Sequence, residues 1–402
     1  MNTICERSFS PNDASLQIDN LFDELGLKVL EDRHEQGFSA SHIVVEGENG
    51  ILSSGSGKGV HHKIGARAEC IEHYFTQTAL ARPEGTASSH QVANQKLLAN
   101  DGIIRSLLQF DEIEIPVVKM DPLDECIDAS VLIPHTLINP DIFDVHETDD
   151  EAHLFLGKYS SNSGTAFGLT KYESQLHALM ETIERHTQSN LFLSILGHKV
   201  EQDFVHTKLS SKLMGHLSCA PELTELPEIN LIGCKTLGGA YFFCAVEASP
   251  KGTLAEYGAG CSQDALFALE RAVSECAQCI GIVKGEELEE DKRAIELFAE
   301  LPGLDILKTL SVEKMDNLAN TFTHTESIAY LLDKGIQAKS IADPEEMLRS
   351  CIGHLTAEGY NVVGCDTKTG EFGYVSRVYV PGFDRFHLIR SGLKVAPNSV
   401  LA

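Results

Sequence analysis

Residues 170–188, TKYESQLHALMETIERHTQ, carry the clearest structural signal in this 402-residue chain. Thr170 followed by Glu173 matches the capping box that begins a helix, in which the two side chains bond to each other's backbone N–H groups. At about 100° per residue, five polar side chains fall within about 80° of one another: Glu173, His177, Glu181, Glu184 and Gln188. The opposite flank is apolar, so the pattern predicts a helix that buries one side and presents a column of oxygen atoms on the other.

Two further stretches, 64–78 and 265–280, are predicted to form helices with similar polar faces. These faces consist of Glu69, Glu72 and His73 in the first helix, and of Asp264, Arg271, Glu275 and Gln278 in the second. Carboxylates three residues apart repel each other on a helix unless positive charge lies between them. Any one face alone fits an ordinary solvated helix surface. Their repetition favours a shared site for a magnesium–nucleotide complex.

The residue types on these faces suit such a site. Mg²⁺ prefers carboxylate oxygens, phosphate oxygens and water, and takes few protein ligands. Arg185 and Arg271 can grip phosphate oxygens in bidentate fashion, and Lys58 can approach a phosphate as a point charge. We therefore treat all three cations as candidates for phosphate binding.

Residues 55–59, GSGKG, share part of the P-loop pattern but fail it at two positions. Leu52 stands where the first glycine belongs, and Gly59 stands where the metal-binding hydroxyl belongs. We expect instead a glycine- and serine-rich loop over 47–59 that allows close backbone approach to a nucleotide.

Composition excludes several functional classes. With 32 basic and 59 acidic residues, the net charge of −27 argues against a nucleic-acid or anionic-membrane surface. The chain has no apolar run of about 18 residues and no signal-peptide pattern at its start, which predicts a cytoplasmic protein that does not bind membranes. The 11 cysteines are an odd number, and members such as Cys70, Cys244 and Cys276 lie inside predicted helices or strands, as expected of reduced thiols. We interpret the Cys276–Cys279 pair as buried helix residues, because no second pair has zinc-site spacing.

The remaining sequence alternates short strands with helices, without a regular βαβ repeat. Helical spacing extends over 13–29 and 91–110, and strands are predicted at 42–46, 113–118, 129–134, 230–236, 240–248, 359–366 and 373–380. This order predicts an α+β (mixed α/β) architecture. The acidic stretch 141–151 contains little that could pack, so we place a possible internal boundary there.

In their order along the chain, these motifs resemble those of the YcaO-domain family. The family pattern is a GKG element before an E-x-x-E helix, a small polar segment before A-L-x-E-x-x-E-R, and a glycine-rich turn before A-L-x-R-A-x-x-E-x-x-Q. The matching residues here are Gly57-Lys58-Gly59 with Glu69 and Glu72, then Asn162-Ser163-Gly164 and Thr170 to Glu173 with Glu181, Glu184 and Arg185, then Gly258 and Gly260 with Arg271, Glu275 and Gln278. Ser163 falls where the family's asparagine aligns.

The resemblance implies a YcaO-like fold, with antiparallel or mixed sheets flanked by helices and a nucleotide site between helices. It implies ATP and Mg²⁺ as cofactors. Metal binding is expected at Glu69, Glu72, Glu181, Glu184 and Gln278, and nucleotide binding at Lys58, Ser163, Glu173, Arg185, Arg271 and Glu275. We expect an N-terminal appendage at 1–55 and an ATP-binding domain at 56–402.

The same resemblance implies activity on the backbone amides of a ribosomally made peptide or protein. Such enzymes use ATP to form azolines from Cys, Ser or Thr, or thioamides from external sulfide. The implied partner is a ubiquitin-activating-like or TfuA-type protein, and a homodimer is also compatible.

The first helix departs from the family pattern. Gly65 stands where a serine is expected, His73 stands where an arginine is expected, and the spacing from GKG to the glutamates is about one helical turn shorter. These departures leave open a catalytically degenerate subunit that binds nucleotide or a partner. Residues 394–402 lack the proline-rich tail of azoline-forming members, which favours thioamide formation without excluding ring formation.

Overall fold

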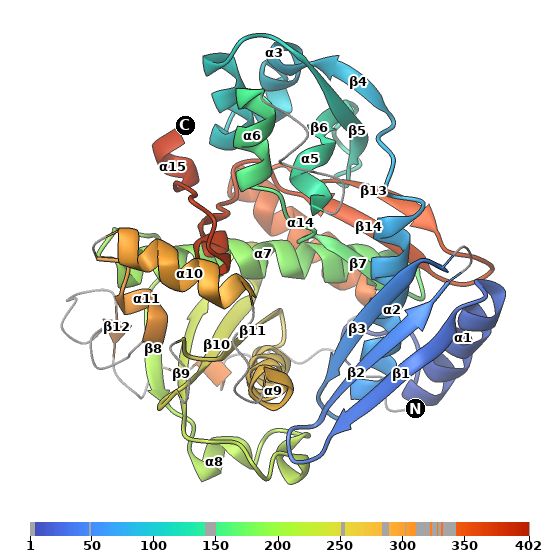
Figure 1. Ribbon diagram of the computed structural model, residues 1–402, viewed down its shortest axis with the longest axis vertical. Helices are drawn as coiled ribbons and strands as arrows, with labels where there is room; N and C mark the ends of the chain where they lie inside the picture. The colour runs from blue at the N-terminus through green and yellow to red at the C-terminus, as the bar shows by residue number, and fades with distance from the viewer. Residues whose placement is uncertain are drawn as a thin grey trace.

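The computed structural model describes residues 5–47, 50–140, 150–250, 254–283, 289–301, 303–310, 322–323, 328, 331–332 and 343–401. The strands in these ranges form three sheets, which are antiparallel except for one short parallel pair. Helices flank the sheets, so the predicted α+β architecture is confirmed (Figure 1). Most of the acidic stretch 141–151 lies outside the described residues.

The first sheet has the order β1-β2-β3, and its strands are β1 (Lys28–Glu35), β2 (Ala40–Glu46) and β3 (Leu52–Lys58). Helix α2 (His62–Gln77) packs on β2 and β3, and α1 (Pro11–Glu24) packs on α2. Helix α1 is shorter than the helical spacing over 13–29 suggests, because β1 begins at Lys28. The apolar sides of α1 and α2 meet in one cluster with the buried residues of β2.

The loop predicted over 47–59 is wrong for residues 52–58, which form β3. The glycines here serve helix packing instead. A Cβ atom at Gly55 or Gly57 would collide with the backbone of α2, at Ala66 and His62 respectively. Without side chains at these two positions, α2 can lie directly against the strand. Lys58 is then held at the end of a strand rather than in a loop.

The second sheet has the order β11-β10-β9-β8-β12. Its strands are β8 (Phe204–Lys208), β9 (Ile229–Lys235), β10 (Tyr241–Glu247), β11 (Tyr257–Ser262) and the short parallel strand β12 (Phe322–Thr323). Every residue of β10 is buried. Phe243 and Ala245 pack in the cluster that contains α9 (Ala265–Val283), whereas Phe242 and Cys244 pack in the main core on the other face. Helices α8 (Ser211–Met214), α10 (Glu289–Glu300) and α11 (Ile306–Thr309) lie around this sheet (Figure 1).

The third sheet has the order β4-β5-β13-β14-β7, with β6 paired to β5. Its strands are β4 (Gly85–Ser88), β5 (Glu114–Pro122), β6 (Val131–Pro134), β7 (Thr165–Gly168), β13 (Val363–Lys368) and β14 (Tyr374–Tyr379). The single helix predicted over 91–110 is wrong. That segment contains α3 (Ser89–Ala93), η2 (Lys96–Leu98), α4 (Gly102–Arg105) and η3 (Ser106–Gln109). Asp101 interrupts it by accepting a bond from Ile104 N at 2.9 Å, which starts a new helix.

Helix α7 (Lys171–Ile195) runs across the centre of the molecule, between the first and second sheets below it and the third sheet above (Figure 1). Its predicted start is confirmed, because the Thr170 hydroxyl accepts a bond from Glu173 N at 3.2 Å. The helix packs on β7, β14 and β11, on α14 (Pro344–Ala357) and on η8 (Phe386–Ser391).

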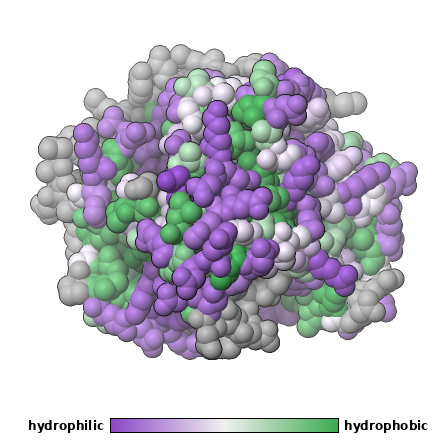
Figure 2. Space-filling model, turned by 90° about the horizontal axis from the view of Figure 1, so that it is seen from above, coloured by the Kyte–Doolittle hydropathy of each residue, from purple (hydrophilic) through white to green (hydrophobic). Residues whose placement is uncertain are grey.

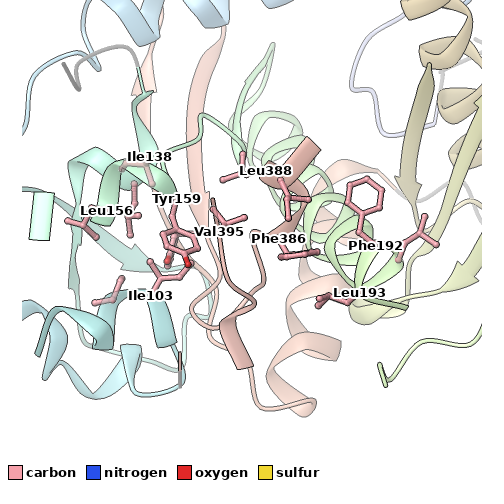
Figure 3. Packing of buried hydrophobic residues seen from close by; sticks show 14 of the residues in the cluster. Ile103, Ile138, Leu156, Tyr159, Phe192, Leu193, Phe386, Leu388 and Val395 are labelled. Atoms are coloured by element: carbon pink, nitrogen blue, oxygen red, sulfur yellow. The ribbon is translucent and has the colours of Figure 1, made fainter. Parts of the chain in front are cut away.

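The main core holds the C-terminal half of α7. Figure 3 shows Phe192 and Leu193 of α7 packed near Phe386, Leu388 and Val395 from the end of the chain. The same cluster includes Ile103 of α4, Ile138 of α5 (His135–Ile138), Leu156 of α6 (Glu151–Lys158) and Tyr159. Burying one large apolar side chain contributes about 1.5–3 kcal/mol. This packing fixes α7, and the polar N-terminal half of the helix is positioned with it.

The face drawn in Figure 2 is dominated by hydrophilic residues, with hydrophobic ones in separate patches among them. Among the described residues, none of the helices combines the length and the apolar character needed to cross a bilayer.

Candidate functional site

The three predicted polar faces meet at one cavity of about 1250 Å³, which α2, α7 and α9 border. Ten of the predicted site residues line this cavity: Lys58, Glu69, Glu72, Glu173, Glu181, Glu184, Arg185, Arg271, Glu275 and Gln278. The alternative of an ordinary solvated surface does not hold for α7 and α9, because Glu173, Glu184 and Gln278 are only 4%, 2% and 8% exposed. Residues that are more than 200 positions apart in the chain therefore share one concave site.

On α7, Arg185 lies among carboxylates of its own helix. Its Nη2 is 3.7 Å from Glu181 Oε1, and its Nη1 is 3.8 Å from Glu184 Oε1. Nη1 also donates a bond to Gln188 Oε1 at 3.2 Å, and Gln188 donates to the Tyr257 hydroxyl at 2.6 Å. Burial opposes the charge on Arg185, but Glu184 and Glu181 outweigh it and raise the pKa of the guanidinium. Arg185 is a fixed cation held in a set orientation.

A salt bridge between Lys58 and Glu275 connects the end of β3 to α9. Burial alone would raise the pKa of Glu275, but Lys58 and then Arg185 lower it below its usual value. Glu275 is therefore ionised, and it directs the Lys58 ammonium toward the cavity wall.

The carboxylates of α2 itself are in a different state. Glu69 Oε2 accepts a bond from Ser56 N at 3.1 Å, and Glu72 Oε2 accepts one from Phe167 N at 3.2 Å. Burial raises the pKa of Glu69, and it raises that of Glu72 strongly, with Glu181 and Glu69 adding to the effect on Glu72. Burial also raises the pKa of Glu181, despite the nearby Arg185. Burial therefore disfavours the charged form of all three carboxylates.

Some buried polar atoms in the cavity wall lack a hydrogen-bond partner within the described part of the chain. They are Glu184 Oε2, Gln278 Nε2 and His177 Nε2. An unsatisfied buried polar atom costs about 1–3 kcal/mol, so such atoms usually have an unseen partner. Their position on one cavity fits a polar ligand.

The donor set fits Mg²⁺ together with a nucleotide rather than Mg²⁺ alone. In the ranges that the structure covers, no group of three or more His, Cys, Asp or Glu side chains could hold a metal ion by itself. Mg²⁺ commonly binds through one or two carboxylates, substrate phosphates and water. The acidic α2 side could supply such carboxylates, and the cations on the α7–α9 side could face the phosphates.

Ser163 lies beside the main cavity rather than in its wall. It lines a small neighbouring cavity of about 20 Å³, and its hydroxyl accepts a bond from Ser161 Oγ at 2.7 Å. The preceding residue, Asn162, lines the main cavity instead. The next residue, Gly164, donates its N–H to Glu181 at 3.2 Å. The turn that contains Ser163 therefore borders the cavity, but the side chain that lines the cavity is that of Asn162.

Residues before position 55 contribute to the site, which sequence reasoning missed. Arg7 Nη1 lies 2.9 Å from Glu173 Oε1, and Ser8 N donates to Glu173 Oε2 at 3.3 Å. Arg7 lines the cavity, as do Phe9 and residues of α1. Strand β3 also crosses position 55, so the predicted appendage shares a sheet with the chain that follows it. No local pattern in the first residues signals these contacts.

His177 is a neutral group in the cavity wall. Sequence reasoning placed it on the polar stripe of α7, and the structure confirms that position. Burial, and then the charges of Arg7 and Arg271, lower its pKa well below the usual value. The uncharged imidazole can donate or accept one hydrogen bond at Nε2.

Comparisons with known proteins agree with this geometry. The family model described as YcaO cyclodehydratase, ATP- and Mg²⁺-binding, matches residues 56–384. A search of curated proteins found no match to this sequence.

Several solved structures share the fold. The YcaO from Methanopyrus kandleri, solved with AMPPCP and Mg²⁺, is 15% identical, with 98% of each chain covered and a TM-score of 0.64. A heterocyclase in complex with substrate and cofactor is 16% identical, with 95% of this chain and 54% of that chain covered and a TM-score of 0.58. A chain of the E. coli microcin synthetase McbBCD complex is 11% identical, with 89% and 88% covered and a TM-score of 0.54.

At these identities the structures show the fold, whereas the family model extends over most of the chain. The protein belongs to the YcaO family, and its cofactors are ATP and Mg²⁺.

Proposed function

We propose that this protein uses ATP and Mg²⁺ to phosphorylate a backbone amide oxygen, which leads to an azoline or a thioamide in a ribosomally made peptide or protein. The observation that carries the proposal is the convergence of carboxylates and cations from β3, α2, α7 and α9 on one cavity. The family match and the heterocyclase-like fold support the same class of reaction.

The chemistry requires that a poor leaving group become a good one. A Cys, Ser or Thr side chain of the peptide, or external sulfide, attacks the carbonyl carbon and forms a new bond, leaving an oxyanion. The proton of the attacking thiol, hydroxyl or hydrosulfide passes to solvent. The oxyanion then accepts the γ-phosphoryl group of ATP as the bond to ADP breaks, and the C–O bond breaks afterwards as phosphate departs. Loss of the amide proton completes an azoline C=N bond, whereas sulfide attack leaves a C=S bond. Phosphoryl transfer of this kind depends mainly on positioning and charge neutralisation.

The cavity residues divide by charge into two roles. Glu69, Glu72, Glu181, Glu184 and Gln278 would hold Mg²⁺, and Lys58, Arg185 and Arg271 would bind phosphate oxygens. A bound Mg²⁺ would neutralise phosphate charge and orient the transferred group. Glu275 orients Lys58, and Glu173 holds Arg7 at the cavity wall. Ser163 would act only through the turn that brings Asn162 and the Gly164 N–H to the site.

Delivery of the peptide by a separate protein is part of the proposal. The microcin synthetase relative was solved as a multi-protein complex, in one case with pro-MccB17 bound. We expect a ubiquitin-activating-like or TfuA-type partner here. A stable complex with such a protein in size-exclusion chromatography would support this part.

A second candidate function is a nucleotide-binding subunit without turnover. It is favoured by the departures at the first helix, where Gly65 and His73 replace a serine and an arginine. The structure shows that His73 is engaged locally, since its Nδ1 lies 2.7 Å from the Ser54 carbonyl oxygen. This helix therefore supplies two carboxylates to the cavity, whereas its one arginine, Arg67, pairs with Asp19 of α1 and does not line the cavity.

Phosphate release from ATP with Mg²⁺ separates the two candidates. The full chain is assayed alone and with a Cys/Ser/Thr-rich peptide, with and without sulfide. An enzyme shows basal or peptide-stimulated release, and mass spectrometry of the peptide shows loss of one water or exchange of oxygen for sulfur. Glu184→Gln should abolish release, whereas Glu296→Gln, at an exposed position on α10, should not. A chain that binds ATP but never releases phosphate would contradict the enzymatic proposal.

A further inference from the structure

The side chains of Glu6 and Arg7 lie on opposite sides of the cavity wall. Arg7 lines the cavity, and its side chain is 39% exposed. Glu6 is buried, with a side-chain exposure of 0%, and lies behind the wall. Its Oε2 is 3.8 Å from Nη1 of Arg271, which does line the cavity. Arg271 therefore has Glu6 on its protein side and the cavity on the other.

We propose that Glu6 is a positioning residue, which holds the Arg271 guanidinium in the orientation needed to bind nucleotide phosphate. The inference rests on the proposed function, in which Arg271 is one of the phosphate-binding cations. Glu6 itself does not touch the nucleotide in this arrangement.

The contacts of Glu6 favour this role. Its Oε1 accepts a hydrogen bond from Ser262 Oγ, and Oε2 has no hydrogen bond to any residue that the structure describes. Burial raises the pKa of Glu6, and Arg271 is the strongest influence that opposes this, so Arg271 is the counter-ion of the ionised carboxylate. A guanidinium carries five N–H donors, which leaves donors for a phosphate when one edge faces Glu6.

The residue that hydrogen-bonds to Glu6, Ser262, is itself connected to the start of α9. The Ser262 hydroxyl that donates to Glu6 also accepts a bond from Asp264 N at 3.0 Å. Asp264 in turn accepts bonds from Leu266 N and Phe267 N in the first turn of α9, at 2.9 and 3.0 Å. Glu6 is thus held by the end of β11, directly before the helix that carries Arg271, which suits a fixed geometry.

The backbone around Glu6 is also held from the α7 side. Glu6 has φ of +64°, a left-handed conformation that residues other than glycine rarely adopt. Ser8 contacts the start of α7 twice, through its N–H on Glu173 and through its hydroxyl, 3.0 Å from Thr170 Oγ1. The segment therefore connects α7 and α9, and it fixes Glu6 in a strained conformation between them.

The test compares nucleotides in the Glu6→Gln variant of the full chain. Glutamine keeps the size of the side chain and can still accept from Ser262, but it loses the charge that faces Arg271. Calorimetry with Mg²⁺ should show ATP affinity reduced roughly three- to tenfold, and AMP affinity reduced less, because Arg271 acts on phosphates. In an Arg271→Gln background, which removes the guanidinium charge, the Glu6→Gln change should have a much smaller effect, since both act through one interaction.

Ser10→Ala is the matched control. Ser10 caps α1 by accepting from Asp13 N at 3.3 Å, so its loss loosens the same segment without altering the charge near Arg271. We expect lower thermal stability and unchanged ATP affinity. Glu6→Asp keeps the carboxylate but places it farther from Arg271, so it should show the same ATP-selective loss of affinity to a smaller degree. This variant replaces Glu6→Gln in the test if Glu6→Gln does not fold.

The possible outcomes of these experiments test the role of Glu6 separately from the proposed function on which it rests. Unchanged or tighter ATP binding by the folded variants would overturn the positioning role, and tighter binding would mean that Glu6 competes with phosphate for Arg271. An equal loss for ATP and AMP would also overturn it, because that pattern reports general loosening. No ATP binding by the unaltered chain would instead overturn the proposed function itself.

Discussion

The α7–α9 side of the cavity and the α2 side differ in how their carboxylates are compensated. On the first side, Arg185 lies near Glu181 and Glu184, and Lys58 is paired with Glu275. Each carboxylate there has a nearby cation. Burial alone would raise the pKa of Glu275, but the charges of Lys58 and Arg185 outweigh burial and lower it.

The α2 side carries two glutamates and no arginine. His73 is its nearest basic group, with Nε2 3.9 Å from Glu69 Oε1. Burial raises the pKa of both Glu69 and Glu72, and the charge of Glu181 adds to this at Glu72. The comparison indicates that the α7–α9 side is ready to receive an anion, whereas the α2 side needs an added cation. In the proposed site, Mg²⁺ would supply that cation, held by Glu69 and Glu72 together with Glu181, Glu184 and Gln278 of the other side.

The largest effect is expected from Arg185→Ala on the balanced side. Its loss leaves Glu181 and Glu184 without their cation, and both then repel phosphate. ATP affinity measured by calorimetry should fall at least about 100-fold, with the helical content retained in circular dichroism. Arg105→Ala, at an exposed position on α4, should leave affinity unchanged. The site assignment is ruled out if both Arg185→Ala and Glu184→Gln bind ATP normally.

A smaller but still clear loss is expected from Glu72→Gln on the unbalanced side. The glutamine can still accept from Phe167 N, but it removes a carboxylate that would bind Mg²⁺. Titration of Mg²⁺ at saturating ATP should show the metal requirement raised by about tenfold or more. Nucleotide binding without metal should change little. A variant with an unchanged Mg²⁺ requirement would remove Glu72 from the metal site.

The same change should stabilise the nucleotide-free protein near neutral pH, by about 1 kcal/mol. Because burial raises the folded-state pKa of Glu72, the folded protein binds more protons than the unfolded chain between the two pKa values. The contribution of Glu72 to the free energy of unfolding is therefore fully present at low pH. It is lost as the pH rises through the folded-state pKa of Glu72. The advantage of Glu72→Gln in denaturant unfolding should be greatest at neutral pH and vanish near pH ~4. An advantage that grows on acidification would contradict the raised pKa.

The smallest effect is expected from His73→Arg, which would place an arginine of α2 at the cavity. A permanent charge four residues after Glu69 should stabilise the nucleotide-free protein by about 0.5 kcal/mol. Thermal unfolding against the unaltered chain measures this. A lower melting temperature would mean that the His73 contact with the Ser54 carbonyl outweighs the charge.

Several features of this protein were predictable because they depend on local geometry. Thr170 defines the start of α7 by accepting a bond from Glu173 N within one helical turn, whereas the Glu173 carboxylate bonds to Arg7 and Ser8 instead of completing the capping box. The three polar faces follow from residue spacing, since side-chain direction on a helix is set by its own period. The strands at 230–236 and 373–380 were likewise predictable, and β9 and β14 lie there within a residue or two.

Other features escaped prediction because they depend on contacts far along the chain. Gly55 and Gly57 read locally as a loop, but they lie in a strand because α2 packs against them. Glu6 and Arg7 carry no local signal, and their roles depend on Arg271 and Glu173, each more than 160 residues away.

The spacing of the residues therefore predicted the order of the motifs and the polar faces of the helices. It also indicated the nucleotide and metal chemistry. That these faces enclose one cavity, that Asn162 rather than Ser163 lines it, and that the first residues complete its wall depended on long-range packing. The physical reason is that helical period governs which side chains share a face, while only burial against distant elements determines where that face points.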